Sequence, residues 1–383
     1  MAIENINGIA DAVTPELQAN MVTLPPEAMI EGITELDDGS AIVGDMEMES
    51  ETPIAIPFDA NLADHIDEDV LSEISSQLTG DIEDDTNSRS DWEEQYKSGL
   101  ELLGMTYEDR SEPFEGASGI VHPLLAESVT QFQAQAYREM LPAGGPVKTT
   151  IIGAETPEVM AQAERVKNYM NYQITYEMEE YDPELDQMLF YLPIVGSAFK
   201  KVYFDPNMQR AVSKFVHSED LIVPYNATDL ATATRITHCI RMDKNEIRKL
   251  QLSGFYKDID LPESGSDSDT MSDVKDTIND IEGITNGSSE NEEMMIYEVH
   301  TNLDIEGFED IGADGEPTGL KMPYIVTIME DSGDVLSIKR NFNESDPLRR
   351  KVPYFVHYKF LPGLGFYGFG LTHTIGGLSR AST

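Results

Sequence analysis

Residues 1–88 contain no lysine or arginine, and this feature limits what the chain can fold into more than any other. The segment carries 22 aspartates and glutamates, scattered prolines and few aromatic side chains. Like charges at this density repel one another, and the apolar surface is too small to offset the entropy lost on ordering. The composition therefore predicts a disordered acidic arm over residues 1–88. Two short apolar clusters in it, residues 53–58 and 70–78, are candidates for docking on a partner, and a solvated tail is the alternative.

The whole chain has 383 residues and a formal net charge of −45. Binding of nucleic-acid phosphates depends on clustered lysines and arginines that displace counterions, so this balance argues against a tight nucleic-acid binder. We expect any contact with double-stranded DNA to be transient and non-specific. The length is sufficient for two or more folding units.

Nothing in the sequence directs the chain to an export pathway or a membrane. The start, MAIENINGIADA, lacks the basic and apolar regions of a signal peptide. The longest apolar stretch, residues 188–199, is interrupted by Pro193 and is too short to cross a bilayer. The single cysteine, Cys239, cannot form an intramolecular disulfide, which fits a reducing compartment. A soluble protein is predicted.

Helical periodicity begins directly after the acidic arm. Ser90-Asp91-Trp92-Glu93 matches a capping box, and apolar residues follow it at helical spacing. Thr156-Pro157-Glu158 and Asp182-Pro183-Glu184 are further start signals, because each combines a polar cap, a first-turn proline and an acidic residue. Four helices are predicted, over residues 90–104, 122–140 and 156–178, and from residue 182 to a stop at Pro193 and Gly196. The third carries an apolar stripe of Val159, Ala163, Val166, Met170, Ile174 and Met178, which we interpret as core.

From residue 199 the apolar period changes to two, which is typical of strands. Strands are predicted over residues 147–152, 199–205, 210–216, 221–224, 235–242, 295–304, 322–330, 335–341 and 353–361, with a short helix over 243–252 capped by Asp243. An antiparallel meander is their simplest packing. Residues 258–293 hold twelve acidic residues against the single Lys275, which predicts a mobile surface insertion.

These elements predict an α+β fold in which an N-terminal helical part packs with antiparallel β hairpins and a meander. The expected segments are a disordered acidic arm (1–88), a helical part (89–198), a β-hairpin region with a short helix (199–257), an acidic flexible insertion (258–293), an antiparallel β region (294–361), and a glycine-rich bend with the start of a helix (362–383). Because the chain stops at the opening of an apolar helix, we expect a longer natural product.

Motifs of known chemistry are absent or incomplete. Residues 363–368 match G-x-G-x-x-G, but no acidic residue follows Gly368 and no βαβ unit precedes it, so a dinucleotide site is not predicted. The best histidine grouping is His217 beside Glu219 and Asp220, interpreted as a surface hydrogen-bond network. Residues 267–269 and 310–315 are acidic but lack a full calcium-ligand pattern. We predict no catalytic residue, no cofactor and no metal site, and we do not expect an enzyme.

Five long stretches of the sequence, taken in their order along the chain, carry a family resemblance. They are EPFEGASGIVHPLLAESVTQFQAQAYREMLPAGGPVKTTIIG, YMNYQITYEMEEYDPELDQMLFYLPIVGSAFKKVYFDP, LIVPYNATDL, KLQLSGFYKDI and FLPGLGFYGFGLTHTIGGL. Together they resemble the portal (head-to-tail connector) proteins of short-tailed bacteriophages. The resemblance spans residues 91–383 apart from the acidic insertion, and the family chain continues beyond Thr383. This sequence is similar to the front part of such a subunit, which forms part of the outer wing.

The resemblance implies a structural, non-catalytic role in a ring, usually of twelve subunits, at one vertex of the capsid. Double-stranded DNA is packaged and ejected through such a ring. The implied partners are further copies of the chain, the terminase large subunit, tail and adaptor proteins, and the major capsid and scaffold proteins. The implied location is the virion, after assembly in the bacterial cytoplasm.

A ring also requires head-to-tail contacts between different surfaces of neighbouring subunits. Our hypothesis is that a group of basic residues meets acidic surface on a neighbour. These candidate subunit contacts are Lys339, Arg340, Arg349, Arg350 and Lys351. An exposed solvated face and a DNA contact are the alternatives for this group. Two other functions stay open: another virion or scaffold-like interaction protein with an acidic partner-binding arm, and a carboxylate-based metal-dependent hydrolase.

Overall fold

The computed structural model describes residues 56–104, 121–206, 208–262, 272–282, 293–312 and 315–382, together with the backbone of two short strands. The chain divides into two units, Met1–Ile56 and Pro57–Thr383. In the first, β1 (Ile33–Glu35) pairs antiparallel with β2 (Ala41–Val43). The rest of the predicted arm up to residue 55 lies outside the described residues.

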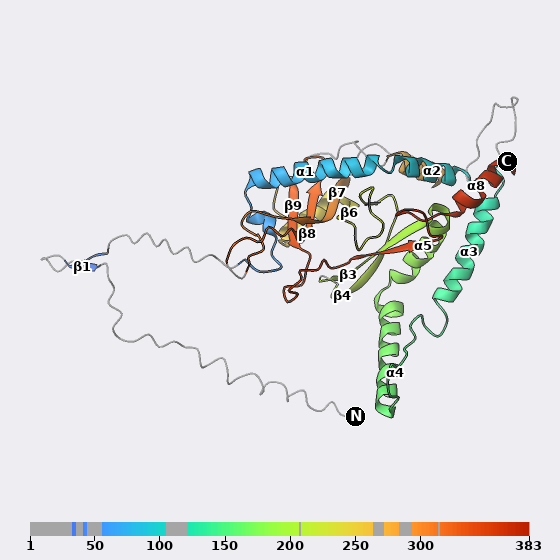
Figure 1. Ribbon diagram of the computed structural model, residues 1–383, viewed down its shortest axis with the longest axis horizontal. Coiled ribbons are helices and arrows are strands. Elements are labelled where there is room, and N and C mark those ends of the chain that lie inside the picture. Colours follow the sequence, from blue (N-terminus) through green and yellow to red (C-terminus); the bar gives the residue numbers. More distant parts are fainter. Residues whose placement is uncertain are drawn as a thin grey trace, which may run out of the picture. The chain divides into compact units, whose positions relative to one another are not determined.

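The second unit contains helices and antiparallel sheets, which confirms the α+β class (Figure 1). Its helical elements are η1 (Leu62–Asp64), α1 (Glu68–Asn87), α2 (Ser90–Glu101), α3 (Leu124–Met140), α4 (Pro157–Tyr172), η2 (Gln173–Glu177), α5 (Tyr181–Val195), α6 (Lys244–Leu252), α7 (Ser272–Glu282) and α8 (Leu371–Ser382). Its strands are β3 (Ser197–Asp205), β4 (Arg210–Val216), β5 (Leu221–Ile222), β6 (Arg235–Asp243), β7 (Glu293–Leu303), β8 (Met322–Met329), β9 (Val335–Arg340) and β10 (Phe355–Lys359).

The strands form two sheets. One has the order β10-β3-β4 and the other the order β5-β6-β7-β8-β9, with every neighbouring pair antiparallel. The predicted hairpin around Pro206 is therefore confirmed. The predicted meander is confirmed for β7, β8 and β9, but not for the strand predicted over residues 353–361, because β10 pairs with β3 in the other sheet. The strand predicted over residues 147–152 is wrong, because this segment has no regular secondary structure and pairs with no strand in the described chain.

The prediction of an acidic arm over residues 1–88 is wrong for its last part. Helix α1 occupies residues 68–87 and buries Leu71, Leu78 and Ile82, each at most 3% exposed. It lies over the five-stranded sheet in Figure 1, where it contacts β5 and β9. The apolar cluster at residues 70–78 thus packs on the chain's own sheet.

Helix α2 begins where it was predicted, but without the capping box. Its N-cap is Arg89, which makes no side-chain cap, and Ser90 is already helical. The chain arrives from the last turn of α1 through a tight turn in which the amide of Arg89 donates to the carbonyl of Thr86. Because α1 leads directly into α2, the start of α2 does not depend on a side-chain cap from Ser90.

The predicted mobile insertion is also partly wrong. Residues 272–282 form α7, and Val274 is 5% exposed against the cluster around Tyr96 and Leu100 of α2. Residues 263–271 and 283–292 lie outside the described residues. Here the apolar spacing within α7 outweighs the acidic composition of the segment.

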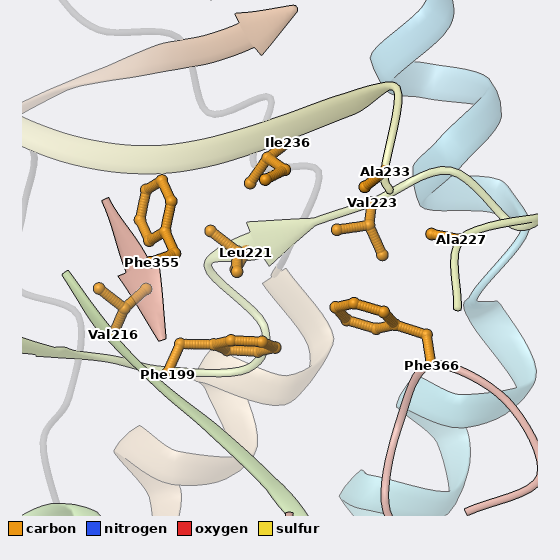
Figure 2. Packing of buried hydrophobic residues seen from close by; sticks show 9 residues of the cluster. All are labelled: Phe199, Val216, Leu221, Val223, Ala227, Ala233, Ile236, Phe355 and Phe366. Carbon is orange, nitrogen blue, oxygen red and sulfur yellow. The ribbon is translucent and has the colours of Figure 1, made fainter. Parts of the chain in front are cut away.

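One hydrophobic core joins the two sheets (Figure 2). Phe199 of β3 and Phe366 of the loop after β10 stack with 5.9 Å between their ring centroids. Leu221 of β5 and Ile236 of β6 meet them from the other sheet. A second core, between α3 and α5, contains the predicted Leu185, Met188, Leu189 and Leu192.

Polar side chains cover two edge strands. The carboxylate of Glu180 accepts from the amide of Ser213 on β4 at 3.2 Å. On β9, the Asn61 side chain accepts from the amide of Ile338 at 2.9 Å and donates to the carbonyl of Leu336 at 3.1 Å. These contacts satisfy backbone groups that an exposed sheet edge would offer to other chains.

Candidate functional site

Helix α4 differs from the other long helices because none of its side chains is buried. Val159, Val166, Tyr169 and Met170 are 37%, 44%, 59% and 42% exposed. The prediction that the apolar stripe of this helix forms core is therefore wrong for Val159, Val166 and Met170, whereas Met178 at its end is 9% exposed. The four exposed residues, which we call the α4 face, form a candidate interaction surface.

The start of α4 follows its sequence signals. The Thr156 hydroxyl accepts from the amide of Val159 at 3.3 Å, and Pro157 occupies the first turn. A neighbouring side of the helix holds the segment that precedes it. Asn171 accepts from the amide of Val147 at 2.9 Å and donates to its carbonyl at 3.2 Å. These bonds replace the strand pairing that was predicted for residues 147–152.

At its other end α4 continues into the π-helical turn η2, the only element of the described chain that it contacts extensively. The rings of Tyr172 and Tyr176 stack there, 5.7 Å apart, and are 50% and 72% exposed. Just beyond, Arg210 of β4 forms an ion pair with Glu180 at 2.7 Å. This pair fixes the base of the helix to the three-stranded sheet while the face above stays open.

A second candidate is a buried group of charges between the sheets. Lys201 Nζ of β3 lies 2.6 Å from Glu298 Oε1 of β7, and His300 Nε2 lies 2.8 Å from the same oxygen. Burial alone would raise the pKa of Glu298, but the Lys201 ammonium and the His300 hydrogen bond lower it well below its ordinary value. Burial, reinforced by Lys201, lowers the pKa of the adjacent His238 to about 3.

The charges in this group neutralise one another, and the group has no reactive side chain. The side chains of Lys201 and Glu298 are 14% and 19% exposed, and each neutralises the other. A charged pair with its partner in place supplies neither a free base nor a free nucleophile. The pair joins β3 to β7, and it could not be predicted because the two residues lie far apart along the chain.

Lys200 is the sequence neighbour of Lys201, but its side chain is buried among different residues. Its ammonium lies 4.2 Å from the ring centroid of Tyr181, and it has no hydrogen-bond partner in the described part of the chain. Burial lowers its pKa to about 8, although Glu184 and Glu180 act in the opposite direction. Lys200 and Lys201 are therefore adjacent in sequence but do not form an exposed basic face.

Arg89, the first basic residue of the chain, is likewise buried. Its guanidinium donates to the carbonyl of Glu219 at 2.6 Å and to that of Leu221 at 3.0 Å, and it pairs with Glu93 at 2.8 Å. It thus links the start of α2 to the turn between β4 and β5.

All five predicted subunit contacts have partners in their own chain, and three of them contact other elements of the fold. The Lys339 ammonium lies 3.4 Å from the ring centroid of Phe255. Arg340 donates to the carbonyl of Phe58 at 2.8 Å. Lys351 donates to the carbonyl of Ala233 at 2.9 Å.

The other two lie in the turn before β10. Arg349 donates to the carbonyl of Glu344 at 2.9 Å. Arg350 pairs with Asp346 at 2.8 Å, and its side chain is 75% exposed. The role of the five residues at a subunit contact stays a prediction, and among them Arg350 presents the most accessible charge.

The G-x-G-x-x-G segment packs against a strand of its own chain. The amide of Gly368 donates to the Ser197 hydroxyl at 2.8 Å. A Cβ on Gly196, whose φ is 92°, would lie 2.4 Å from the carbonyl oxygen of Gly368. Glycine at these two positions therefore allows two backbones to touch.

The His217 group is not the surface network that was predicted. Glu219 is 3% exposed, and His217 Nδ1 lies 3.8 Å from its carboxylate. The His217 ring packs against Phe215 and Tyr191, with centroids 4.4 and 4.6 Å apart. This grouping belongs to the packing between α5 and β4.

Within the described ranges, no three or more histidine, cysteine, aspartate or glutamate side chains lie close enough to hold a metal ion. Residues 267–269, considered as a calcium loop, and positions 313–314 of the second such loop are outside those ranges. None of the described helices is both long and apolar enough to span a bilayer.

Comparison with protein-family models gives no match for this chain, and no curated protein matches it significantly.

Proposed function

We propose that this chain is a structural subunit of a phage portal ring, which forms the conduit for packaging and ejection of double-stranded DNA. The observation that carries the proposal is that separate stretches with the portal resemblance meet in one core. Phe199, Leu221 and Phe366 come from three of these stretches and pack together in Figure 2. Leu125, from a fourth stretch, packs in the core that also contains Ile194. The stretches that carry the resemblance therefore pack on one another. This mutual packing supports reading their order and length along the chain as one shared fold.

The contacts of the basic residues support a role as a conduit for DNA. Arg89, Lys200 and Lys201 are turned inward, and Arg235 and Lys351 are held by groups of their own chain. A strongly acidic protein in which several cations are occupied internally does not hold phosphate tightly. DNA can therefore pass along such a surface instead of binding to it.

The proposed position is one vertex of the capsid, reached by assembly in the bacterial cytoplasm. Its partners there are further copies of the chain, the terminase large subunit, tail and adaptor proteins, and the major capsid and scaffold proteins. Contact with DNA is transient. The catalysis of packaging belongs to the terminase in this proposal.

Negative-stain microscopy and native mass spectrometry of the purified chain test the proposal. A portal subunit gives rings with a central channel and one dominant subunit number, expected to be twelve. A chain that stays monomeric at all concentrations, yet binds other virion proteins through its acidic segment, overturns the ring and supports the scaffold-like interaction protein instead. Cross-linking to the terminase large subunit is the second readout, with bovine serum albumin as an acidic control.

A further inference from the structure

The α4 face is an apolar surface that the described part of the chain leaves open. Val159, Val166 and Met170 follow one another at helical spacing and share one side of the helix. On α3 a similar pattern is covered, since Leu125 and Val129 are 0% exposed. The two helices have similar apolar patterns, so the pattern does not explain the difference in burial. Among the described residues, α3 finds a packing partner and the α4 face does not.

The charges around this face are balanced. Residues 138–176 contain four basic residues, Arg138, Lys148, Arg165 and Lys167, and four acidic residues, Glu139, Glu155, Glu158 and Glu164. This neutral segment belongs to a chain whose net charge is −45. On α4 itself, Glu158, Glu164, Arg165 and Lys167 form no ion pair within the described chain.

We propose that the α4 face packs against a second copy of this chain. Two copies carry like charge and repel one another over most of their surfaces, but they can approach without this penalty at a neutral segment. Unpaired charges of both signs beside the apolar stripe can be matched by an identical surface or by another mixed surface of the same chain. A nucleic acid would require an excess of basic residues, and a basic partner would favour the acidic surfaces elsewhere.

The composition of the face fits such a contact. Protein interfaces are rich in tyrosine and methionine at their centres, with charged residues at the rim. Tyr169 and Met170 lie beside Val166, and Glu164 and Arg165 lie next to them in sequence. The inference rests on the proposed function, which supplies the need for a second copy, and it names the surface through which copies of the subunit meet.

The test compares two double variants of the full chain by sedimentation and mass photometry. Val166→Asp with Met170→Asp places two charges on the α4 face. Tyr225→Asp with Leu252→Asp adds the same charge at positions that are 86% and 76% exposed on other elements. Because two carboxylates at the centre of the contact would lose their hydration without gaining a partner, the α4 variant should self-associate roughly 100-fold more weakly, which corresponds to about 2.8 kcal/mol. The control variant should associate like the original chain, and both should keep the original helix content by circular dichroism.

A photo-cross-link identifies what covers the face. Tyr169→p-benzoylphenylalanine is mixed with isotope-labelled copies, and the equivalent change at Tyr225 is the control. Cross-links from position 169 to labelled peptides support the proposal. Cross-links confined to residues 1–55 of the same copy overturn it, because the chain's own N-terminal segment would then be the occupant.

The outcomes separate this inference from the proposed function. If rings form and persist in the α4 variant, the inference fails and the portal proposal stands. If the original chain forms an assembly other than a ring and the α4 variant dissolves it, the inference stands and the portal proposal fails. If the original chain is monomeric at all concentrations, both fail.

Discussion

Lys201 of β3 and Glu298 of β7 form an ion pair of 2.6 Å that connects the two sheets of this fold. The pair lies beside the apolar core that contains Phe199 and Phe355. In such surroundings each charge depends on the other, because neither can be fully hydrated. The connection between the sheets is therefore electrostatic as well as hydrophobic.

Removing one partner of this pair should destabilise the protein more than removing both. Glu298→Gln leaves the Lys201 ammonium without its counter-charge, and we expect a loss of about 3 kcal/mol in the free energy of unfolding. Lys201→Met combined with Glu298→Leu should cost less than Glu298→Gln alone, because no charge is then left without a partner. Urea unfolding of the original chain and of both variants measures these differences. A loss below about 0.5 kcal/mol for Glu298→Gln would contradict a paired, desolvated carboxylate.

Acidification should destabilise the fold through two histidines. Burial lowers the pKa of His238 from 6.5 to about 3, and burial likewise lowers that of His357 to about 3. Between these values the unfolded chain binds protons that the folded chain does not, so stability rises with pH across this window and is lost as the pH falls. The lowered pKa of Glu298 acts in the same direction below its ordinary value of 4.5.

Urea unfolding at several pH values between 4 and 7 measures this effect. Each histidine contributes a slope of up to about 1.4 kcal/mol per pH unit. His238→Phe keeps a ring against Phe355 but cannot bind a proton, so its slope should be shallower than that of the original chain. An unchanged slope would show that His238 does not contribute.

Much of the fold could be predicted because its signals are local. The proline and threonine at the start of α4, the apolar spacing of α3 and the alternation in β3 and β4 act within a few residues. Contacts between distant residues could not be predicted in this way. The open α4 face shows the limit most clearly, because an apolar stripe predicts burial but does not say whether the cover belongs to the same chain.

The same limit explains the error at α1. Asp81 and Asp85 counted as repelling charges in the sequence, yet both bind Arg235 of β6, at 2.6 and 2.7 Å. Arg235, 150 positions further along the chain from Asp85, neutralises these charges where the apolar side of α1 packs on the sheet. Composition alone cannot reveal a partner at that distance.

Arg235 should therefore be essential for the attachment of α1. Arg235→Ala leaves Asp85, which is 7% exposed, without a cation, and we expect a loss of about 2 kcal/mol. Hydrogen exchange in residues 68–87 should accelerate more than in α3. Arg350→Ala is the control, because its pair with Asp346 is at the surface and its loss should leave unfolding and exchange unchanged. Equal effects of the two changes would refute this role.

Gly196 should tolerate no larger residue, in contrast to a glycine of the G-x-G-x-x-G segment. A Cβ at Gly196 would meet the backbone of Gly368 and Gly370 at 2.4 and 2.5 Å, and its φ of 92° is strained for other residues. Gly196→Ala should cost about 3 kcal/mol, because two backbones must move apart. Gly365→Ala meets no atom within 4 Å and should change the free energy of unfolding little. If the middle glycine of the motif proved the more sensitive of the two, a role beyond backbone packing would have to be sought for this loop.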